Sequence, residues 1–459
     1  MRWTMYRTGW YAGLGARAIE AGQIDASAQP LPPTSTWDVP CEPNWPTTFT
    51  ITLPSYATSG VYAVKLVAGN NASMMTFVVR DDNRKADLVF QRSDFTDAMY
   101  NNWDGATNRS SYYGDHPQWI SLDRVMRSAA GWLYPYSGGY FNYEYSMVRF
   151  LEREGYDVTY ISNLDVHQNV HALERGKAFL SVGHDEYWSP AMRDEIEGAR
   201  DRGMHIAIFS SDTCDGVLRF KADDAHAFSV NTLDATAANP LRNEWNGKPV
   251  DLSLPPDQNP EDTLTGTHYA GWCAQPHPDC SYDSFAKLTE TDALTISATT
   301  HPLLRHVALD NGSLPSVMGY EYEGRYTGMT PLPFDLVTIG SAAAIDPLIL
   351  PFGGPPVVVA YQAQSGARVF NAGSMHWSHA LDGWSGRTAF RNTGGERECG
   401  SGDGDCFDVE NAAVQQLTVN VLDDMEAKRG SPTPTLVSED HPCDWLRMDC
   451  SPPPAHRER

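Results

Sequence analysis

Residues 180–190, with the sequence LSVGHDEYWSP, form the stretch that decides the fold. The segment before Gly183 is a short apolar run, which is typical of a strand buried on both faces. Ser189 followed by Pro190 predicts the start of a helix, whose apolar stripe continues until Gly203. The stretch therefore predicts a strand, a turn and a helix, with polar side chains gathered where the strand ends.

The turn between this strand and helix carries His184, Asp185, Glu186, Tyr187 and Trp188. Ligands bind at the carboxyl ends of the strands in open α/β sheets, so this turn is a candidate site. A solvated turn whose charges gather by chance is the alternative. Five polar or aromatic side chains in succession are more than a connector needs, and they favour a functional role.

The chain is long and acidic. It has 459 residues, with 34 Lys and Arg against 58 Asp and Glu, which gives a formal net charge of −24. This length allows two or three domains, and the acidity makes nucleic acid and membrane surfaces poor partners. No apolar run approaches the roughly 18 residues of a membrane span. Residues 1–13 lack the pattern of a signal peptide and read like the middle of a domain.

Six of the eight cysteines share one spacing, which predicts three local disulfides in Gly-, Pro- and Asp-rich loops. Chance spacing of thiols is the alternative, and a zinc site would need tighter pairs. Oxidised pairs would indicate a secreted or periplasmic protein, whereas the missing signal peptide indicates the cytoplasm. Cys41 and Cys214 stand outside the pattern. The pairs are Cys273 with Cys280, Cys399 with Cys406, and Cys443 with Cys450.

Hydrophobic patterning divides the chain into three parts. Residues 1–82 contain segments that alternate with a period of two, and these predict a small Ig-like β-sandwich. Residues 83–430 alternate strands with helices, which predicts a parallel α/β sheet covered by helices, with a Pro-rich insertion at about 222–300. Residues 431–459 form a Pro-rich tail. The alternating segments of the first part lie at 48–53, 62–66 and 76–79.

The α/β part predicts a cleft at one sheet edge. Its first four strands are expected at 87–90, 157–161, 178–183 and 205–210. A flavodoxin-like order of 2-1-3-4 would place the loops after the first and third strands side by side. The long aromatic loop after the first strand would then face the turn that begins at His184.

Several residues around this cleft are candidate substrate contacts. Asn102, Trp103 and Asp104 lie in the aromatic loop, and Trp188 ends the opposite turn. His376 follows a hairpin predicted to turn at residues 365–366, and its loop should face the same cleft. Turn-forming roles for Asn102 and Asp104, and a structural role for His376, are the alternatives.

The sequence excludes some chemistries and favours another. It has no Gly-rich phosphate loop, no G-x-S-x-G elbow and no cysteine directly after the third strand. The sheet edge instead offers phenol and carboxylate oxygens, which suit a hard ion such as ferric iron. Core packing of the tyrosines is the alternative. The candidates are Tyr143, Tyr145, Tyr187, Glu186, Glu321 and Glu323.

Eight stretches resemble one known family. They are SGVYAVKLVAG, TFVVRDD, NNWDG, MVRFLEREGYDVTYISNLD, FLSVGHDEYWS, HPL at 301–303, SVMGYEYEG and GARVFNAGSMHWSHALD. They lie within residues 45–220 and 300–428, and HDEYW with LEREGYDV upstream is the most specific combination. In these stretches the chain resembles the large-subunit family of N,N-dimethylformamidase, with its wider family of C-terminal domains.

The resemblance implies a glutamine-amidotransferase-like α/β domain after a β-sandwich, and a mononuclear ferric iron held by two tyrosines and one glutamate. By position, Tyr187 is the first tyrosine. Tyr145 is the choice for the second, with Tyr143 as the alternate. Glu321 is preferred over Glu323 as the glutamate. Packing tyrosines and a surface acid are the alternatives, and zinc is a less favoured metal.

The activity that the resemblance implies is hydrolysis of the C–N bond of a small linear amide. His184 would orient a ligand or the attacking water, and Asp185 or Glu323 would carry the proton. The alternatives are that His184 hydrogen-bonds to a backbone carbonyl and that Asp185 only stabilises the turn. A non-catalytic protein that binds a sugar or peptide is the second reading. A homo-oligomer and a separate small subunit both stay open, and the unmatched region at 222–300 leaves the substrate open.

Overall fold

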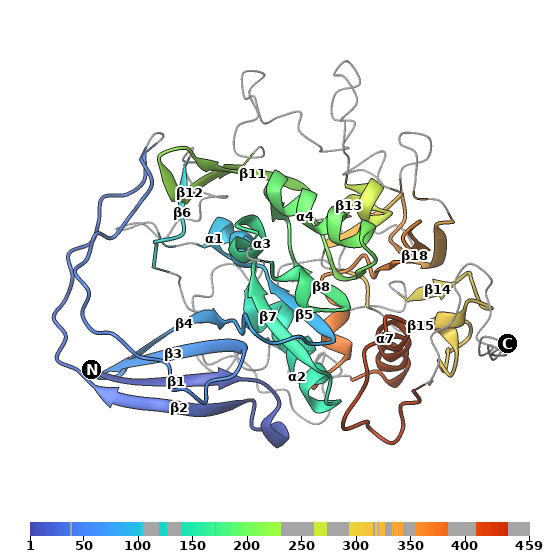
Figure 1. The fold of residues 1–459 in the computed structure, drawn as a ribbon, viewed down its shortest axis with the longest axis horizontal. Coiled ribbons are helices and arrows are strands. Elements are labelled where there is room, and N and C mark those ends of the chain that lie inside the picture. The colour runs from blue at the N-terminus through green and yellow to red at the C-terminus, as the bar shows by residue number, and fades with distance from the viewer. Residues whose placement is uncertain are drawn as a thin grey trace, which may run out of the picture.

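The computed structural model describes residues 1–36, 39–101, 103, 119–125, 139–169, 171–230, 261–272, 293–314, 317–319, 321–325, 333, 335–342, 354–383 and 410–438. These residues form several sheets with helices packed against them (Figure 1). The predicted α/β class is confirmed at this level. None of the helices in these ranges is long and apolar enough to cross a bilayer.

The N-terminal part is a four-stranded antiparallel sheet in the order β2-β1-β3-β4. The strands predicted at 62–66 and 76–79 are confirmed, but the one at 48–53 is wrong. Phe49 and Ile51 pack half-buried against the sheet without joining its ladder, and this produces the alternation. An Ig-like sandwich remains a prediction. The strands are β1 (Arg2–Thr8), β2 (Ala16–Gln23), β3 (Gly60–Ala68) and β4 (Asn71–Val79).

A nine-stranded mixed sheet forms the centre, in the order β15-β14-β17-β18-β19-β10-β8-β5-β7. The predicted order 2-1-3-4 is confirmed, because β7-β5-β8-β10 are neighbouring parallel strands. The predicted hairpin is confirmed by the antiparallel pair β18 and β19. The strands are β5 (Leu88–Arg92), β7 (Val158–Ser162), β8 (Ala178–His184), β10 (His205–Ser211), β14 (Leu294–Ile296), β15 (Ser313–Leu314), β17 (Val337–Ser341), β18 (Val357–Gln362) and β19 (Arg368–Asn371).

Helices cover both faces of this sheet (Figure 1). Helices α2 (Tyr145–Arg153) and α7 (Ala412–Asp424) pack on one face through apolar residues such as Phe150 and Leu417. Helices α1 (Asp94–Tyr100), α3 (Asn163–His167) and α4 (Pro190–Asp201) pack on the other. The predicted start of α4 is confirmed, since the Ser189 side chain accepts a hydrogen bond from the Met192 amide.

Helix α1 corrects the expectation of an uninterrupted loop after the first strand. Phe95, Ala98 and Met99 are buried in the core, and this packing stabilises a helix that carries little sequence signal. The remaining elements are η1 (Tyr11–Gly13), β6 (Ile120–Ser121), the π-helix η2 (Tyr140–Glu144), η3 (Leu173–Arg175), β9 (Tyr187–Trp188), β11 (Gly216–Lys221), β12 (Asp224–Val230), α5 (Asp262–Thr265), β13 (His268–Trp272), η6 (Pro302–Leu304), β16 (Glu321–Gly324) and η7 (Trp377–Ala380).

The N-terminal sheet contacts η2 and α2 through polar side chains. The hydroxyls of Thr8 and Tyr140 lie 2.7 Å apart, and Arg7 pairs with Glu152 at 2.8 Å. The Tyr145 hydroxyl donates to the Gly15 carbonyl. These side chains are largely buried, so the contacts fix the helix relative to the sheet.

Some expectations fall outside the described ranges. The six cysteines of the three predicted pairs all lie there, and no disulfide joins described residues. The disulfides therefore remain predictions. Within the region 222–300, strands β12, β13 and β14 are described, and β14 extends the central sheet. The domain boundaries also stay predictions.

Acid sensitivity is expected from His301. Its Nδ1 accepts a hydrogen bond from the Leu303 amide at 3.2 Å and caps η6, and burial lowers its pKa to about 4. An unfolded histidine titrates near 6.5, so the unfolded chain binds more protons between about pH 6.5 and 4. Stability contributed by neutral His301 is therefore lost as the pH falls through this window. His301→Asn keeps an acceptor and should reduce that loss, by up to about 3 kcal/mol.

Thermal melts of the wild type and His301→Asn between pH 7 and 4.5 measure this effect. The same substitution at exposed His306 is the control. Equal acid-induced shifts in Tm for His301→Asn and the wild type would contradict the prediction.

Candidate functional site

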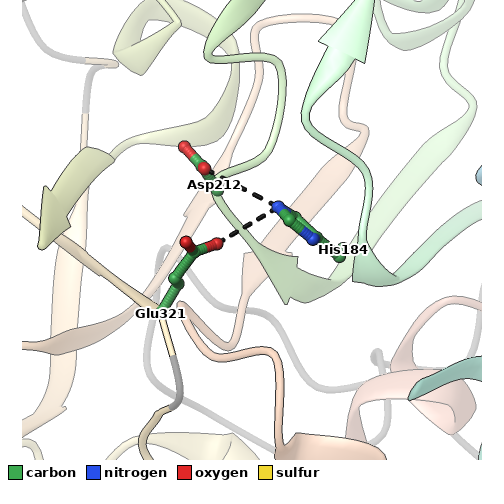
Figure 2. A group of neighbouring side chains, drawn as sticks. All are labelled: His184, Asp212 and Glu321. Carbon is green, nitrogen blue, oxygen red and sulfur yellow. Dashed lines mark ion pairs between the residues drawn. The ribbon is translucent and has the colours of Figure 1, made fainter. Parts of the chain in front are cut away.

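Three buried side chains from different elements converge beyond the carboxyl edge of the sheet. His184 ends β8, Asp212 follows β10, and Glu321 begins β16. The His184 Nε2 atom lies 3.1 Å from Glu321 Oε2 and 3.7 Å from Asp212 Oδ2 (Figure 2). All three residues are buried, with exposed fractions of 2% for His184, 4% for Asp212 and 8% for Glu321. One ligand atom from each lies within 4.8 Å of the others, a spacing that one metal ion could span.

Glu186 is a further carboxylate beside His184 in this cluster. Its Oε2 lies 3.1 Å from His184 Nε2 and accepts a hydrogen bond from the Tyr100 hydroxyl at 2.8 Å. The Tyr100 ring also packs on the imidazole of His184 at 5.3 Å. Three carboxyl groups therefore face one histidine nitrogen in a buried space.

The electrostatics of the cluster follow from burial. Burial raises the pKa of Asp212 well above its usual range, and the neighbouring Glu186, Asp215 and Glu321 raise it further. Burial alone would lower the pKa of His184, but Glu321, Asp212 and Glu186 outweigh it and raise the value well above 6.5. His184 thus holds a proton that several carboxylates attract. A bound cation could take the place of such a proton.

The cluster contains polar atoms whose hydrogen-bonding capacity is not met within the described chain. Glu321 Oε2, Asp212 Oδ1 and both ring nitrogens of His184 are buried and make no hydrogen bond of good geometry with described residues. A buried carboxylate oxygen left in this state costs about 1–3 kcal/mol or more. The donor set therefore fits an ion that binds oxygen and nitrogen ligands.

Asp212 lies in the turn after β10, and Glu323 stabilises this turn. Asp212 has a left-handed φ of 56°, in the turn directly after β10. The Thr213 amide donates to Glu323 Oε1 at 3.0 Å, and the Thr267 hydroxyl donates to Oε2 at 2.8 Å. Glu323 thus holds the turn that carries Asp212.

Asp185 is likewise occupied by structural contacts. It accepts hydrogen bonds from Gln91 at 2.7 Å, Asn163 at 3.0 Å and Ser181 at 2.8 Å. The Trp188 side chain, at the end of the same turn, is fully buried and packs edge-on to Phe179. Asp185 therefore fixes the turn after β8, and Trp188 packs in the core.

The two choices for the second tyrosine separate clearly. Tyr145 faces the N-terminal sheet, where its hydroxyl donates to Gly15, so the structure does not bring it to the cluster. Tyr143 packs edge-on to His184, with ring centres 6.5 Å apart. A Cβ on Gly183 would overlap that of Tyr143, so glycine allows the π-helix η2 to lie against the end of β8.

Tyr187 and His376 both lie beside the cluster. The Tyr187 ring is fully buried, 6.2 Å from that of Tyr100, and its hydroxyl helps to stabilise the Glu186 carboxylate. His376 stacks on Tyr143, with ring centres 6.4 Å apart. These positions bring Tyr187, Tyr143 and His376 around the same space.

The candidates in the aromatic loop are placed only in part. Asn102 and Asp104 lie outside the described residues. Trp103 packs edge-on to Trp45, with ring centres 6.2 Å apart. Two open surface hollows, lined for example by Phe220 and by Lys177, share no residue with the cluster.

Sequence reasoning missed Asp212, Asp215 and Tyr100. The first two follow a buried strand, as His184 does, so the same argument applied to β10 would have found them. Tyr100 had no comparable signal, because its role depends on α1.

A search of curated proteins found no match. A family model described as "N,N-dimethylformamidase beta subunit-like, C-terminal" matches residues 2–393, most of the chain. The chain therefore belongs to the N,N-dimethylformamidase beta subunit-like, C-terminal family.

Proposed function

We propose that this protein is a metal-dependent hydrolase that cleaves the C–N bond of a small linear amide, with a mononuclear ferric iron. Family membership supports a hydrolase of the dimethylformamidase type. The observation that carries the proposal is the buried group of His184, Asp212 and Glu321, in which Glu321 is the proposed iron ligand and His184 and Asp212 lie beside it, with side-chain atoms within 4.8 Å of one another.

Tyr187, Tyr143 and Glu321 are the residues that we propose to hold the iron. Tyr143 replaces Tyr145 in this proposal because Tyr145 contacts Gly15, whereas Tyr143 packs against His184. Phenolate and carboxylate ligands favour a hard ferric ion over zinc, which stays the less favoured alternative. When bound, such an ion would polarise an amide carbonyl and lower the pKa of a coordinated water.

His184 is suited to proton transfer in this reaction. The carboxylates around its Nε2 favour the protonated imidazole, which can give a proton to the amine nitrogen as the C–N bond breaks. The proton lost by the water that adds to the carbonyl carbon would first pass to the neighbouring Glu186 carboxylate, 3.1 Å from His184 Nε2, and would return to His184 after the C–N bond breaks. One amide and one water thus give one acid and one amine, and Tyr100 keeps Glu186 in place throughout.

The remaining candidates take supporting roles in this proposal. Asp185 fixes the turn after β8, and Glu323 fixes the turn that carries Asp212. The confirmed strand order supports the more specific proposal of a glutamine-amidotransferase-like fold.

Elemental analysis of the purified protein tests the proposal. We expect iron and a visible tyrosinate-to-iron absorption band in the wild type, and loss of both in Tyr187→Phe and Tyr143→Phe. Tyr145→Phe is the matched control and should keep both, because its hydroxyl contacts Gly15. A colourless, iron-free wild type that still binds a sugar or peptide would instead favour a binding protein. Zinc in place of iron would keep the hydrolase and change the metal.

A further inference from the structure

Helix α1 holds the backbone of the turn that carries Glu186 and Tyr187. The Thr96 side chain on this helix is completely buried, and its Oγ1 atom accepts hydrogen bonds from the Glu186 amide at 3.0 Å and the Tyr187 amide at 3.4 Å. We propose that Thr96 is a positioning residue for the reaction centre, which directs these two side chains to the space around His184. This inference rests on the proposed function, in which Tyr187 binds iron and Glu186 relays a proton.

Two successive amides of this turn point to one hydroxyl oxygen. Consecutive backbone N–H groups of this kind form a concave donor site, and Thr96 Oγ1 fills it. Glu186 is also held through its carbonyl, which accepts a hydrogen bond from the Gly216 amide at 3.0 Å. Without the Thr96 oxygen, two buried amides would lose this acceptor, and the turn would have to move to satisfy them.

Tyr100 fixes the side chain of Glu186 from the same face of α1, because it lies four residues after Thr96. Its hydroxyl donates to Glu186 Oε2 at 2.8 Å, and the same oxygen lies 3.1 Å from His184 Nε2. Thr96 therefore fixes the backbone of Glu186, and Tyr100 fixes its carboxylate. One face of the helix thus sets the separation of the two groups that exchange the proton.

The same helix also reaches the segment of the other proposed tyrosine ligand. Asp97, next to Thr96, pairs with Arg92, and Arg92 donates to Glu144 Oε1 at 2.6 Å. Glu144 follows Tyr143 directly in η2. Displacement of α1 would therefore disturb both tyrosines, one through the backbone of the turn and one through Arg92.

Replacement of the hydroxyl alone separates this role from packing. Valine has nearly the shape of threonine but no acceptor, so Thr96→Val keeps the packing of α1 and removes the two hydrogen bonds. We expect iron binding to weaken about 10- to 100-fold, the usual effect of removing a group that orients metal ligands. In the iron-loaded variant, kcat should fall with little change in KM, and the tyrosinate-to-iron band should shift. Thr96→Ser keeps the oxygen and should restore iron binding, kcat and the band.

Hydrogen–deuterium exchange of the metal-free protein gives a readout that does not depend on iron. The amides of Glu186 and Tyr187 should exchange several-fold faster in Thr96→Val than in the wild type, because each loses an acceptor. In Thr96→Ser they should exchange as in the wild type.

Thr159→Val is the matched control. Thr159 is buried in β7, and its hydroxyl lies 3.2 Å from that of Ser59, which precedes β3 in the N-terminal sheet. This variant also loses a buried hydroxyl, but it should keep the iron, the kcat and the slow exchange of the turn. Thr96→Cys, whose sulfur is a weak acceptor, serves as a second variant if Thr96→Val fails to fold, and should change the same quantities in the same direction.

A folded Thr96→Val variant with wild-type iron binding and kcat would overturn the positioning role, and so would a Thr96→Ser variant that is as impaired as Thr96→Val. An iron-free wild type would remove the proposed function. In that protein, faster exchange of the turn in Thr96→Val but not in Thr96→Ser would leave Thr96 standing as the residue that holds the turn, and unchanged exchange would remove this role as well.

Discussion

Replacing His184 with glutamine is expected to lower kcat by about 10²- to 10⁴-fold, the usual contribution of a positioned acid–base group. Glutamine retains polarity but cannot deliver a proton. The nitrogen that would do so lies 3.1 Å from both Glu186 and Glu321, and no other titratable cation pairs with Glu186 or Glu321 in the described chain. The loss should therefore appear in the chemical step.

Steady-state kinetics with a small linear amide, together with iron analysis, measure this effect. His184→Gln should retain iron, because the proposed ligands are Tyr143, Tyr187 and Glu321. His226→Gln, at an exposed surface histidine, is the matched control and should keep full activity. Wild-type kcat in an iron-loaded His184→Gln variant would exclude His184 from proton transfer.

The second large effect is expected on stability, from Arg92→Met. Arg92 ends β5 and is buried, and it donates to Glu144 Oε1 at 2.6 Å and to Asp97 Oδ2. Removing one partner of a buried ion pair costs about 3–5 kcal/mol, because the remaining carboxylates stay buried without their cation. Burial raises the pKa of Glu144 to about 8 although Arg92 lowers it, so loss of Arg92 should raise this pKa further.

Urea denaturation of Arg92→Met measures the change in free energy of unfolding. Arg84→Met is the control, since Arg84 pairs with Asp157 at the exposed surface and should cost less than about 1 kcal/mol. Similar losses in the two variants would show that the buried network contributes little. Glu144 is adjacent to Tyr143 and Asp97 belongs to α1 with Tyr100, so Arg92→Met should also weaken iron binding.

Local sequence signals predicted the parts of the fold that local physics determines. The apolar run before Gly183 and the Ser189-Pro190 start of α4 are examples, since strand burial and helix capping depend on neighbouring residues. The strand predicted from the alternation at 48–53 was wrong, because side chains that are half-buried against a sheet alternate in the same way whether or not their backbone pairs with a strand.

The candidate site was less predictable because its members come from distant segments. Glu321 reaches His184 because β16 pairs with β13 and forms a bridge to Ser374, contacts that no local pattern specifies. Tyr143 and Tyr145 lie two residues apart, so they face different sides of a helix. The π-helix η2 changes the helical phase at this point, and its presence could not be anticipated from composition.

The polar contacts of the N-terminal sheet with η2 and α2 determine whether the protein can be shortened from its N-terminus. Thr8 holds Tyr140, and Arg7 holds Glu152, on either side of the segment that supplies Tyr143. A fragment that begins after residue 82 would lack these contacts, so the segment η2, which carries the proposed ligand Tyr143, would be less firmly held. The sheet thus supports the segment that carries Tyr143, and separating it from η2 and α2 should reduce any activity that depends on the proposed site.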